Sequence, residues 1–540
     1  MALEYPHGHE LARILSEKES NSLDFIVLVS GALDTSDTRN IETYLNDCVR
    51  VLRPGGLLFV QGSPEYLPEL GVFLDSELHF KYWIAIKSEE RTRMAGLPST
   101  HAAVMLFTKG NGRFNVKHTR FPHQKCEFCG RSLRDWGGKT HLMHPDGYVV
   151  SDVWTDLPPA DNHHQLSKPV LDTILRMMDF HDPNGLIGPK AEQSAEFVQG
   201  RLALEFGERG KAYGSVNELE EDRVNIIYCD DALKVLSHYP DNSIDLAFAD
   251  PPYNLNKGYN TYEDGSDEAQ YIEWCNAWLA EYARVLKPTG SLYVLNLPRW
   301  SMHHAAFLNK HLYFQNWIVW DALSEPRGKI MPAHYGLLFY TKHPTDFTFN
   351  YEQVEQIDAH YYCLRASCIR KRKEHGADDK ERLDDIWSDV HRIKHKRDRD
   401  YHPCQLPDSL IERIILLSSN QGDIVLDALC GVGTTPVVAA KLKRRYIGID
   451  LDESYVAITR EKIKDIEITG RVARTSIRKA QPEFTKKELQ LELRDIAIRL
   501  GRLPTPEDVS RMSGYGLEAF LKAFPTWSKA LQAAKIEVRR

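Results

Sequence analysis

Residues 243–255, SIDLAFADPPYNL, join a short apolar run to a carboxylate, two prolines and a tyrosine. The run IDLAFA has the length and composition of a buried strand, so residues 250–253 are predicted to lie in the turn where that strand ends. A related stretch, SLDFIVLVSGALD, occupies residues 22–34. The two stretches each open one copy of a longer repeat, and this repeat decides the predicted fold.

The repeat continues in the same order through both copies. RVLRPGGLLFV from Arg50 matches RVLKPTGSLYV from Arg284, and HAAVMLFTK from His101 matches HYGLLFYTK from His334. Each copy alternates strand-like apolar runs with amphipathic helical stretches, which predicts parallel strands joined by crossover helices. We therefore expect an α/β fold with two tandem Rossmann-like domains and a small all-helical module at the C-terminal end.

The first copy lacks the chemical groups that distinguish the second. Opposite residues 250–253 of the second copy, the first has Ser30, Gly31, Ala32 and Leu33. Neither a carboxylate nor an aromatic ring is present there, and the later glycine-bearing segment of the second copy has no counterpart. We expect the first copy to be catalytically silent.

The second copy carries a glycine-bearing turn in VLDALCGVGTTPVVAAKL, which begins at Val425. Gly431 and Gly433 would let backbone amides approach a ligand at the start of the following helix. The next strand-like run, RYIGID, ends at Asp450, where a carboxylate can accept two ribose hydroxyl protons. The full G-x-G-x-x-G pattern is missing, which disfavours a pyrophosphate ligand.

Taken together, ADPPYNL, HPCQLP, DALCGVGTT and GIDLDESYV resemble the S-adenosyl-L-methionine-dependent amino-methyltransferases of DNA over residues 220–465. The catalytic motif precedes the cofactor motif, as in the permuted group often called beta. Members commonly have Pro and Phe where this chain has Ala428 and Leu429. The resemblance implies tandem methyltransferase domains, of which the first is degenerate.

The resemblance also implies roles for individual residues of the second copy. The catalytic residues would be Asp250, Pro251, Pro252 and Tyr253. The cofactor-binding residues would be Asp231, Gln405, Asp427, Leu429, Gly431, Gly433, Thr434, Thr435 and Asp450. Asp231 and Thr435 have an alternative role as helix caps.

The opening motif suits methylation of an exocyclic amine, whose lone pair is delocalised into the base. Asp250 and the carbonyl of Pro251 can each accept one amine hydrogen, and the prolines hold these acceptors rigidly. Tyr253 would stack on a base rotated out of the duplex. In this family an aspartate at the first position usually accompanies N6-adenine methylation, so we expect adenine. N4-cytosine, RNA or protein-amide methylation and a non-catalytic DNA-binding protein are the alternatives.

The cysteines raise the question of a metal. A C-x₂-C pair followed by an H-x₂-H pair predicts a structural zinc site formed by Cys126, Cys129, His141 and His144. The alternative is a reduced cysteine pair beside surface histidines. In the second copy, Cys363 and Cys368 have looser spacing and zinc is less expected. Each segment lies where the family keeps its target-recognition region, so either could contact DNA instead.

The net charge of −8 argues against an indiscriminate nucleic-acid coat, yet two basic segments stand out. IRKRK and HRIKHKRDR predict a phosphate-facing surface formed by Arg370, Lys371, Arg372, Lys394, Lys396 and Arg397. A solvated helix face is the alternative. The expected partners are double-stranded DNA and, in a restriction-modification role, a cognate restriction endonuclease or other defence protein.

The sequence also predicts domain boundaries. We expect a degenerate copy at 1–185, a helical connector at 186–222, a catalytic copy at 223–470 and a helical DNA-binding repeat at 486–540. The last segment resembles the helical repeat appended to some homing endonucleases, with a partner-docking bundle as the alternative. The absence of a long apolar run or a secretory signal pattern predicts a cytoplasmic protein with no membrane partner.

Overall fold

The chain divides into a large unit, Met1–Lys394 with Tyr401–Ala473, and a small unit that contains Arg474–Arg540. The computed structural model describes residues 13, 15–29, 38–91, 96–110, 116–117, 119–133, 143–159, 166–179, 196–199, 214–255, 265–322, 329–354, 357–358, 363, 365–376, 380–393, 405–469, 486–524 and 526–534. Both copies of the repeat lie in the large unit.

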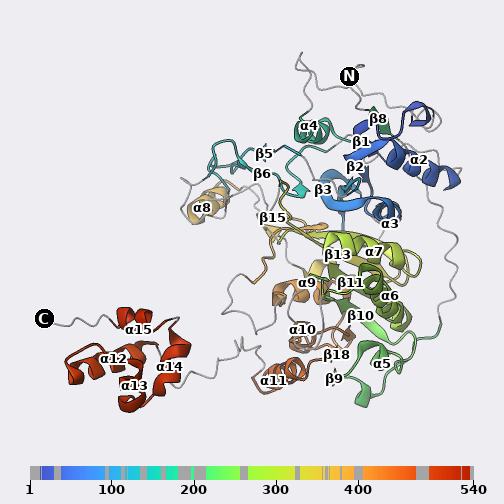
Figure 1. The fold of residues 1–540 in the computed structure, drawn as a ribbon. Helices are drawn as coiled ribbons and strands as arrows, with labels where there is room; N and C mark the ends of the chain where they lie inside the picture. The colour runs from blue at the N-terminus through green and yellow to red at the C-terminus, as the bar shows by residue number, and fades with distance from the viewer. Residues whose placement is uncertain are drawn as a thin grey trace. The chain divides into compact units, whose positions relative to one another are not determined.

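The first copy forms one sheet with helices beside it (Figure 1). Its strands are β1 (Leu23–Val29), β2 (Leu52–Gly62), β3 (His79–Arg91), β4 (Ser99–Thr108), β7 (Val153–Trp154) and β8 (Glu196–Gln199). Its helices are α2 (Thr38–Val51), α3 (Leu67–Glu77) and α4 (Lys168–Met177). The strands are ordered β7-β3-β4-β2-β1-β8.

The second copy forms a larger sheet. Its strands are β9 (Ile226–Cys229), β10 (Ile244–Ala249), β11 (Leu286–Asn296), β12 (Tyr313–Trp320), β13 (Tyr335–Thr341), β16 (Ile386–Trp387), β17 (Ile424–Asp427) and β18 (Arg445–Asp450). Its helices are α5 (Ala232–Leu236), α6 (Glu268–Val285), α7 (Pro298–Leu308), α9 (Asp408–Ser418), α10 (Thr434–Lys441) and α11 (Glu453–Thr469). The order β16-β12-β13-β11-β10 repeats the order of the first sheet, and β17-β18-β9 extend it.

Both copies carry an insertion, between β4 and β7 in the first and between β13 and β16 in the second. The first insertion contains β5 (Arg120–Phe121) and β6 (Tyr148–Val149). The second contains the 3₁₀ helix η4 (Tyr351–Gln353), β14 (Ile357–Asp358), α8 (Ala366–Glu374) and β15 (Lys380–Glu381). In Figure 1, α8 lies beside β5 and β6, so the two insertions meet although they are far apart in the sequence.

Equivalent residues of the two copies make equivalent contacts. Lys109 Nζ donates to Asn21 Oδ1 at 2.9 Å and to the Leu52 carbonyl at 2.7 Å. Lys342 Nζ donates in the same way to Asn242 Oδ1 at 2.8 Å and to the Leu286 carbonyl at 2.7 Å. The predicted repeat is therefore present in the hydrogen bonds as well as in the strand order.

The strand registers correct one detail of the predicted correspondence. Phe59 and Tyr293 are equivalent in the matched sequences, and they pair with Val27 and Phe248 in β1 and β10. Asp250 lies two residues after Phe248, and Val29 lies two residues after Val27. The residue equivalent to Asp250 is therefore Val29 and not Ser30. The conclusion that the first copy lacks the carboxylate holds, because valine is apolar.

The prediction of a helical connector at 186–222 was wrong for residues 196–199. Residues 196–199 form strand β8, which pairs in parallel with β1, where a helix was expected. Near the end of the connector, Glu221–Arg223 form a single 3₁₀ turn, η3. The apolar Phe197 and Val198 favour a strand at this point, and the pairing edge of β1 accommodates it.

The two copies pack against each other through reciprocal contacts. His101 Nδ1 of the first copy lies 3.0 Å from Asp385 Oδ2 of the second, and His334 Nδ1 lies 3.1 Å from Asp152 Oδ1. Backbone amides repeat the exchange, because Thr100 N donates to Asp385 and Ala333 N donates to Asp152. Such an exchange of equivalent contacts is the pattern of a two-fold symmetric dimer interface.

An aromatic pair lies in the same interface. The rings of Trp83 and Trp317, which are equivalent in the repeat, stack with centroids 3.8 Å apart and planes 2° from parallel. Helices α3 and α7 pack side by side (Figure 1). A Cβ atom at Gly71 would overlap Met302, so glycine permits this close approach. The two copies therefore share one continuous buried interior.

The small unit, described by itself, is a bundle of helices. These are α12 (Lys486–Leu500), α13 (Pro506–Met512), α14 (Gly516–Ala523) and α15 (Trp527–Ala533). Thr505 and Asp508 form a capping box at the start of α13, and Phe520 and Trp527 pack in its core. Among the described helices of the whole chain, none is long and apolar enough to cross a membrane.

Candidate active site

Carboxylates gather at one edge of the second sheet. Strands β10, β17, β18 and β9 are parallel neighbours, so their carboxyl ends meet at this edge. Asp250 follows β10, and Asp427 and Asp450 end β17 and β18. Ligands of open α/β sheets bind in the crevice at the carboxyl ends of such strands.

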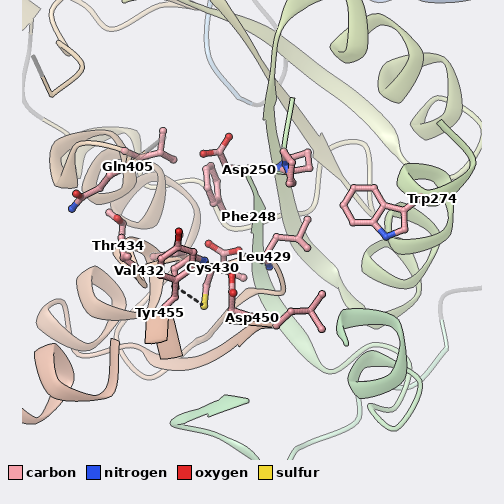
Figure 2. A pocket seen from close by; sticks show the side chains of 17 residues that line it. Phe248, Asp250, Trp274, Gln405, Leu429, Cys430, Val432, Thr434, Asp450 and Tyr455 are labelled. Atoms are coloured by element: carbon pink, nitrogen blue, oxygen red, sulfur yellow. Dashed lines mark hydrogen bonds between the residues drawn. The ribbon is translucent and has the colours of Figure 1, made fainter. Parts of the chain in front are cut away.

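A pocket of about 900 Å³, which includes the open space at its mouth, lies at this edge (Figure 2). Most of the expected site residues line it, namely Asp250, Pro251, Pro252, Gln405, Asp427, Leu429, Gly431, Thr434, Thr435 and Asp450. In Figure 2, Asp250 lies toward the top of the pocket and Asp450 toward the bottom, so one ligand can span both.

The pocket also has lining residues that were not predicted from the sequence. These are Phe248, Trp274, Leu406, Cys430, Val432, Leu451 and Tyr455. Trp274 comes from α6 and Tyr455 from α11, helices whose apolar faces look like ordinary core in the sequence. Leu451 directly follows Asp450 and is 52% exposed, an uncommon state for leucine that could have been suspected only from its place beside the carboxylate.

The glycine turn shapes the floor of the pocket. Gly433 has φ of +76° and its Cβ would overlap the Thr459 side chain, so both backbone conformation and space require glycine. Gly431 N donates to Asp450 Oδ2 at 2.8 Å, and Asp452 N donates to Asp450 Oδ1 at 2.8 Å. The turn therefore fixes the orientation of the Asp450 carboxylate.

Asp427 is a fully buried acid of the pocket with a raised pKa. Burial raises the pKa of Asp427 to about 7, and the nearby Asp450 adds to the rise, whereas a hydrogen bond from Thr435 opposes it. Burial also raises the pKa of Asp450. Two buried acids that resist ionisation in one pocket are stabilised as carboxylates by a cationic ligand.

The turn after β10 is held by several hydrogen bonds. Tyr253 Oη donates to Asp250 Oδ1 at 2.7 Å, and Tyr271 Oη donates to the Pro252 carbonyl at 2.6 Å. Trp300 Nε1 donates to the Tyr253 carbonyl at 2.9 Å. The Tyr253 ring is only 3% exposed and lies outside the pocket lining, so it does not present a stacking face to solvent in this conformation.

Asp231 takes the alternative role that the sequence left open. Its side chain accepts a hydrogen bond from Lys234 N at 2.9 Å and caps the N-terminus of α5. It does not line the pocket. Thr435, by contrast, lies in the first turn of α10 rather than at its cap, and it faces Asp427.

The predicted metal ligands are arranged differently from the expectation. Cys126 and Cys129 lie together with Cys363 and Cys368, whose sulfur atoms all fall within 4.8 Å of one another. His144 is not part of this cluster and points toward Asp146, and His141 lies outside the described residues. The prediction of His144 as a ligand was therefore wrong, because the fold joins cysteine pairs from both copies, whereas the prediction for His141 stays untested.

The basic segments are only partly described. Arg370 and Lys371 are exposed on α8, as the prediction of a DNA-facing surface requires. Arg372 is fully buried and donates to the Cys363 carbonyl at 3.0 Å, so the prediction that it contacts DNA was wrong. Lys394, Lys396 and Arg397 lie outside the described residues.

Comparisons with known proteins bear on both units. Residues 244–461 match the DNA methylase family and residues 484–537 match the homing endonuclease associated repeat. The chain is 36% identical over 249 residues to the type II methyltransferase M.HpaI of Haemophilus parainfluenzae, a match that covers 45% of this chain and 75% of that protein.

Two further relatives match the same region. Identity to the DNA adenine methyltransferase YhdJ of Escherichia coli is 35% over 237 residues, covering 42% of this chain and 78% of the relative. Identity to the type II methyltransferase M.BamHI of Bacillus amyloliquefaciens is 35% over 258 residues, covering 46% of this chain. The match spans 59% of M.BamHI.

Proposed function

This chain belongs to the DNA methylase family, and on that basis we propose that it transfers a methyl group from S-adenosyl-L-methionine to the exocyclic N6 amine of adenine in double-stranded DNA. The observation that carries the proposal is a pocket lined at once by Asp250, Asp427 and Asp450. The names of the relatives support action at specific sequences, and YhdJ supports adenine.

The pocket residues fit the cofactor in both charge and hydrogen bonding. Asp450 would accept the ribose hydroxyls, and Asp427, Thr434 and Gln405 would surround the methionine portion. When bound, the cofactor supplies an electrophilic methyl group on a positively charged sulfur. The buried carboxylates with raised pKa values favour such a cation, which supports this assignment.

Asp250 and the Pro251 carbonyl would accept the two hydrogens of the target amine. This hydrogen bonding favours a tetrahedral nitrogen whose lone pair is available for in-line attack. Asp250 Oδ1 accepts a hydrogen bond from Tyr253 Oη, and the carboxylate has further lone pairs for the amine hydrogen. Tyr253 would stack on the rotated base only if its buried ring left this position.

The first copy would act as a degenerate methyltransferase domain that takes the place of a second subunit. Its reciprocal contacts with the catalytic copy support this role. The small unit, which matches the homing endonuclease associated repeat, would contribute DNA binding. Arg370 and Lys371, exposed on α8, would contact phosphates.

The test incubates duplex DNA with isotopically labelled cofactor and identifies the methylated nucleoside by mass spectrometry. We expect N6-methyladenine with the wild-type chain and a loss of rate of about 100-fold or more with Asp250→Asn, which keeps the shape but weakens the acceptor. N4-methylcytosine as product would overturn the choice of adenine.

A matched control removes a carboxylate elsewhere in the same copy. Asp346 lies exposed in the loop after β13 and outside the pocket lining, so Asp346→Asn should retain the wild-type rate. Cofactor affinity, measured by calorimetry, should be within a few-fold of wild type in Asp250→Asn. Full methylation by that variant would refute the catalytic assignment.

A further inference from the structure

We propose that Cys126, Cys129, Cys363 and Cys368 bind one Zn²⁺ ion that ties the insertion of the first copy to that of the second. Cys126 Sγ lies 3.7 Å from Cys368 Sγ, and Cys129 Sγ lies 3.6 Å from Cys363 Sγ. In a tetrahedral site with Zn–S bonds of about 2.3 Å, neighbouring sulfur atoms lie about 3.8 Å apart. The four free thiols therefore already have nearly the spacing that zinc requires.

The first cysteine pair is held in a tight turn. Cys126 N donates to the Arg131 carbonyl at 2.7 Å, and Gly130 N donates to the Cys126 carbonyl at 2.7 Å. Gly130 has φ of +67°, a conformation that glycine adopts without strain. The turn holds Cys126 and Cys129 in place before any ion arrives, which lowers the entropy lost on binding.

The second cysteine pair lies at the start of α8. Cys363 precedes the helix and Cys368 is in its first turn, with its amide donating to the Arg365 carbonyl at 2.8 Å. The start of the helix therefore holds both sulfur atoms of this pair on the side that faces Cys126 and Cys129. This pair comes from the segment equivalent to the first insertion, so each copy supplies two ligands.

Arg372 provides an independent indication that the cluster is anionic. Its side chain is fully buried, and it donates to Cys368 Sγ at 3.1 Å and to the Cys363 carbonyl at 3.0 Å. Arginine is almost never fully buried unless its charge is compensated. One Zn²⁺ with four thiolates carries two net negative charges, which a neighbouring guanidinium offsets. The cluster thus explains why this arginine is inside the protein.

The ion would act as a clip across a long stretch of chain. The two closest cysteine pairs are separated by 242 and 234 residues in the sequence. Links that close such long loops restrict the unfolded chain most. Phe128 and His375 contact each other edge to face with centroids 5.8 Å apart beside the cluster, so the insertions form one small module around it.

The first experiment measures metal in the full chain purified without chelators. Inductively coupled plasma mass spectrometry should find about one zinc per chain, because a closed four-cysteine site holds a single ion. Cys126→Ser and Cys368→Ser should each lose it, whereas Cys229→Ser, which removes an exposed cysteine outside the cluster, should retain it. Zinc-free protein, even after incubation with excess Zn²⁺, or bound iron would overturn the proposal.

A second measurement covers the case in which the variants fail to fold. Wild-type protein stripped with a chelator and reloaded with Co²⁺ should give the intense visible bands of tetrahedral cobalt–thiolate coordination. The weak spectrum of six-coordinate cobalt would contradict the proposed site, and so would disulfides found among these four cysteines by mass spectrometry.

The consequence for DNA rests on the proposed function. Because the ion fixes α8 with Arg370 and Lys371, stripped protein should bind duplex DNA about tenfold more weakly than zinc-loaded protein, the loss of one or two phosphate contacts. Cofactor binding should be unchanged, since the pocket lies at the ends of β10, β17 and β18. Equal DNA affinity with and without zinc would overturn this consequence, while zinc content tests the site independently of methyl transfer.

Discussion

The raised pKa of Asp427 would couple its protonation to binding of the proposed cofactor. Because burial raises the pKa of Asp427 to about 7, this acid is mostly neutral below pH 7 and ionised above it. A cationic cofactor binds the ionised form more tightly, so its affinity should rise as the pH increases through 7, by up to about tenfold per unit on the acid side. Calorimetric titrations in buffers with different ionisation enthalpies should detect release of a proton on binding.

The control is Asp427→Asn, which keeps the shape and removes the titration. This variant should bind the cofactor weakly and with little pH dependence between about 6 and 8. A wild-type slope that persists in the variant would assign the proton to another group. In the unliganded protein, the raised pKa means that the native state binds a proton more tightly than the unfolded chain does. The contribution of Asp427 to the unfolding free energy should therefore fall as the pH rises from about 4 to 7.

The sequence located the carboxylates of the site better than the rest of it. Asp250, Asp427 and Asp450 each end or follow a short apolar run typical of a buried strand, so the sequence shows where these strands end. Because neighbouring parallel strands end at the same edge of a sheet, the three side chains could be expected to lie close together. Trp274 and Tyr455 could not be found, because a pocket-facing and a core-facing aromatic on a helix have the same periodicity. Asp231 followed a strand as well, yet it caps a helix.

At the scale of elements, the junction of β17 and α10 depends on Gly433. Gly433→Ala would force a side chain into positive φ and against Thr459, which should cost about 2–5 kcal/mol of unfolding free energy. The shift of α10 should also weaken cofactor binding, because Thr434 and Thr435 begin this helix and line the pocket. Denaturant unfolding and calorimetry measure the two effects.

Gly422→Ala separates backbone strain from steric overlap. Gly422 has φ of +89°, but a Cβ atom added there would meet nothing within 4 Å, so this change should cost only about 1–2 kcal/mol and leave cofactor affinity unaltered. If both variants lost the same stability and bound the cofactor equally well, the close contact with Thr459 would not matter.

The arrangement of elements was predictable only where the repeat was recognised. Matching segments indicated that the two copies contain equivalent strands, and the orders β7-β3-β4-β2-β1 and β16-β12-β13-β11-β10 agree with this. The prediction of parallel strands was wrong for β4 and β13, each of which pairs antiparallel with both of its neighbours. Strand β8 was missed, since a four-residue run carries too little pattern and its position depends on the free edge of β1. The four-cysteine cluster was also missed, because contacts between two insertions leave no spacing in the sequence.

At the scale of the whole molecule, the first copy supports the turn that follows β10 in the second copy. Asp75 on α3 accepts hydrogen bonds from Arg299 and His303 on α7, next to Trp300, which holds the turn at Tyr253. Burial opposes ionisation of Asp75, yet the bond from His303 and the charge of Arg299 hold its pKa below the usual value. The first copy therefore anchors α7, the helix that holds the turn at Tyr253.

If the two copies unfold as one, a destabilising substitution in the first copy must also destabilise the second. Trp83→Ala should lower the unfolding free energy of the large unit by about 3–5 kcal/mol, and Trp317→Ala should cost about as much because the two rings are equivalent in the repeat. The double variant should cost less than the sum, with a coupling of about 0.5–3 kcal/mol from the lost stack.

Stabilisation by the cofactor shows whether the pocket unfolds together with both copies. In denaturant unfolding, saturating cofactor should raise the midpoint of the one transition that both tryptophan variants lower, since ligand binding stabilises whatever unfolds with the pocket. Trp527→Ala, which removes a core residue of the small unit, should leave that transition unchanged. Two separate transitions in Trp83→Ala, with the cofactor-sensitive one at its wild-type midpoint, would mean that the two copies fold independently of each other.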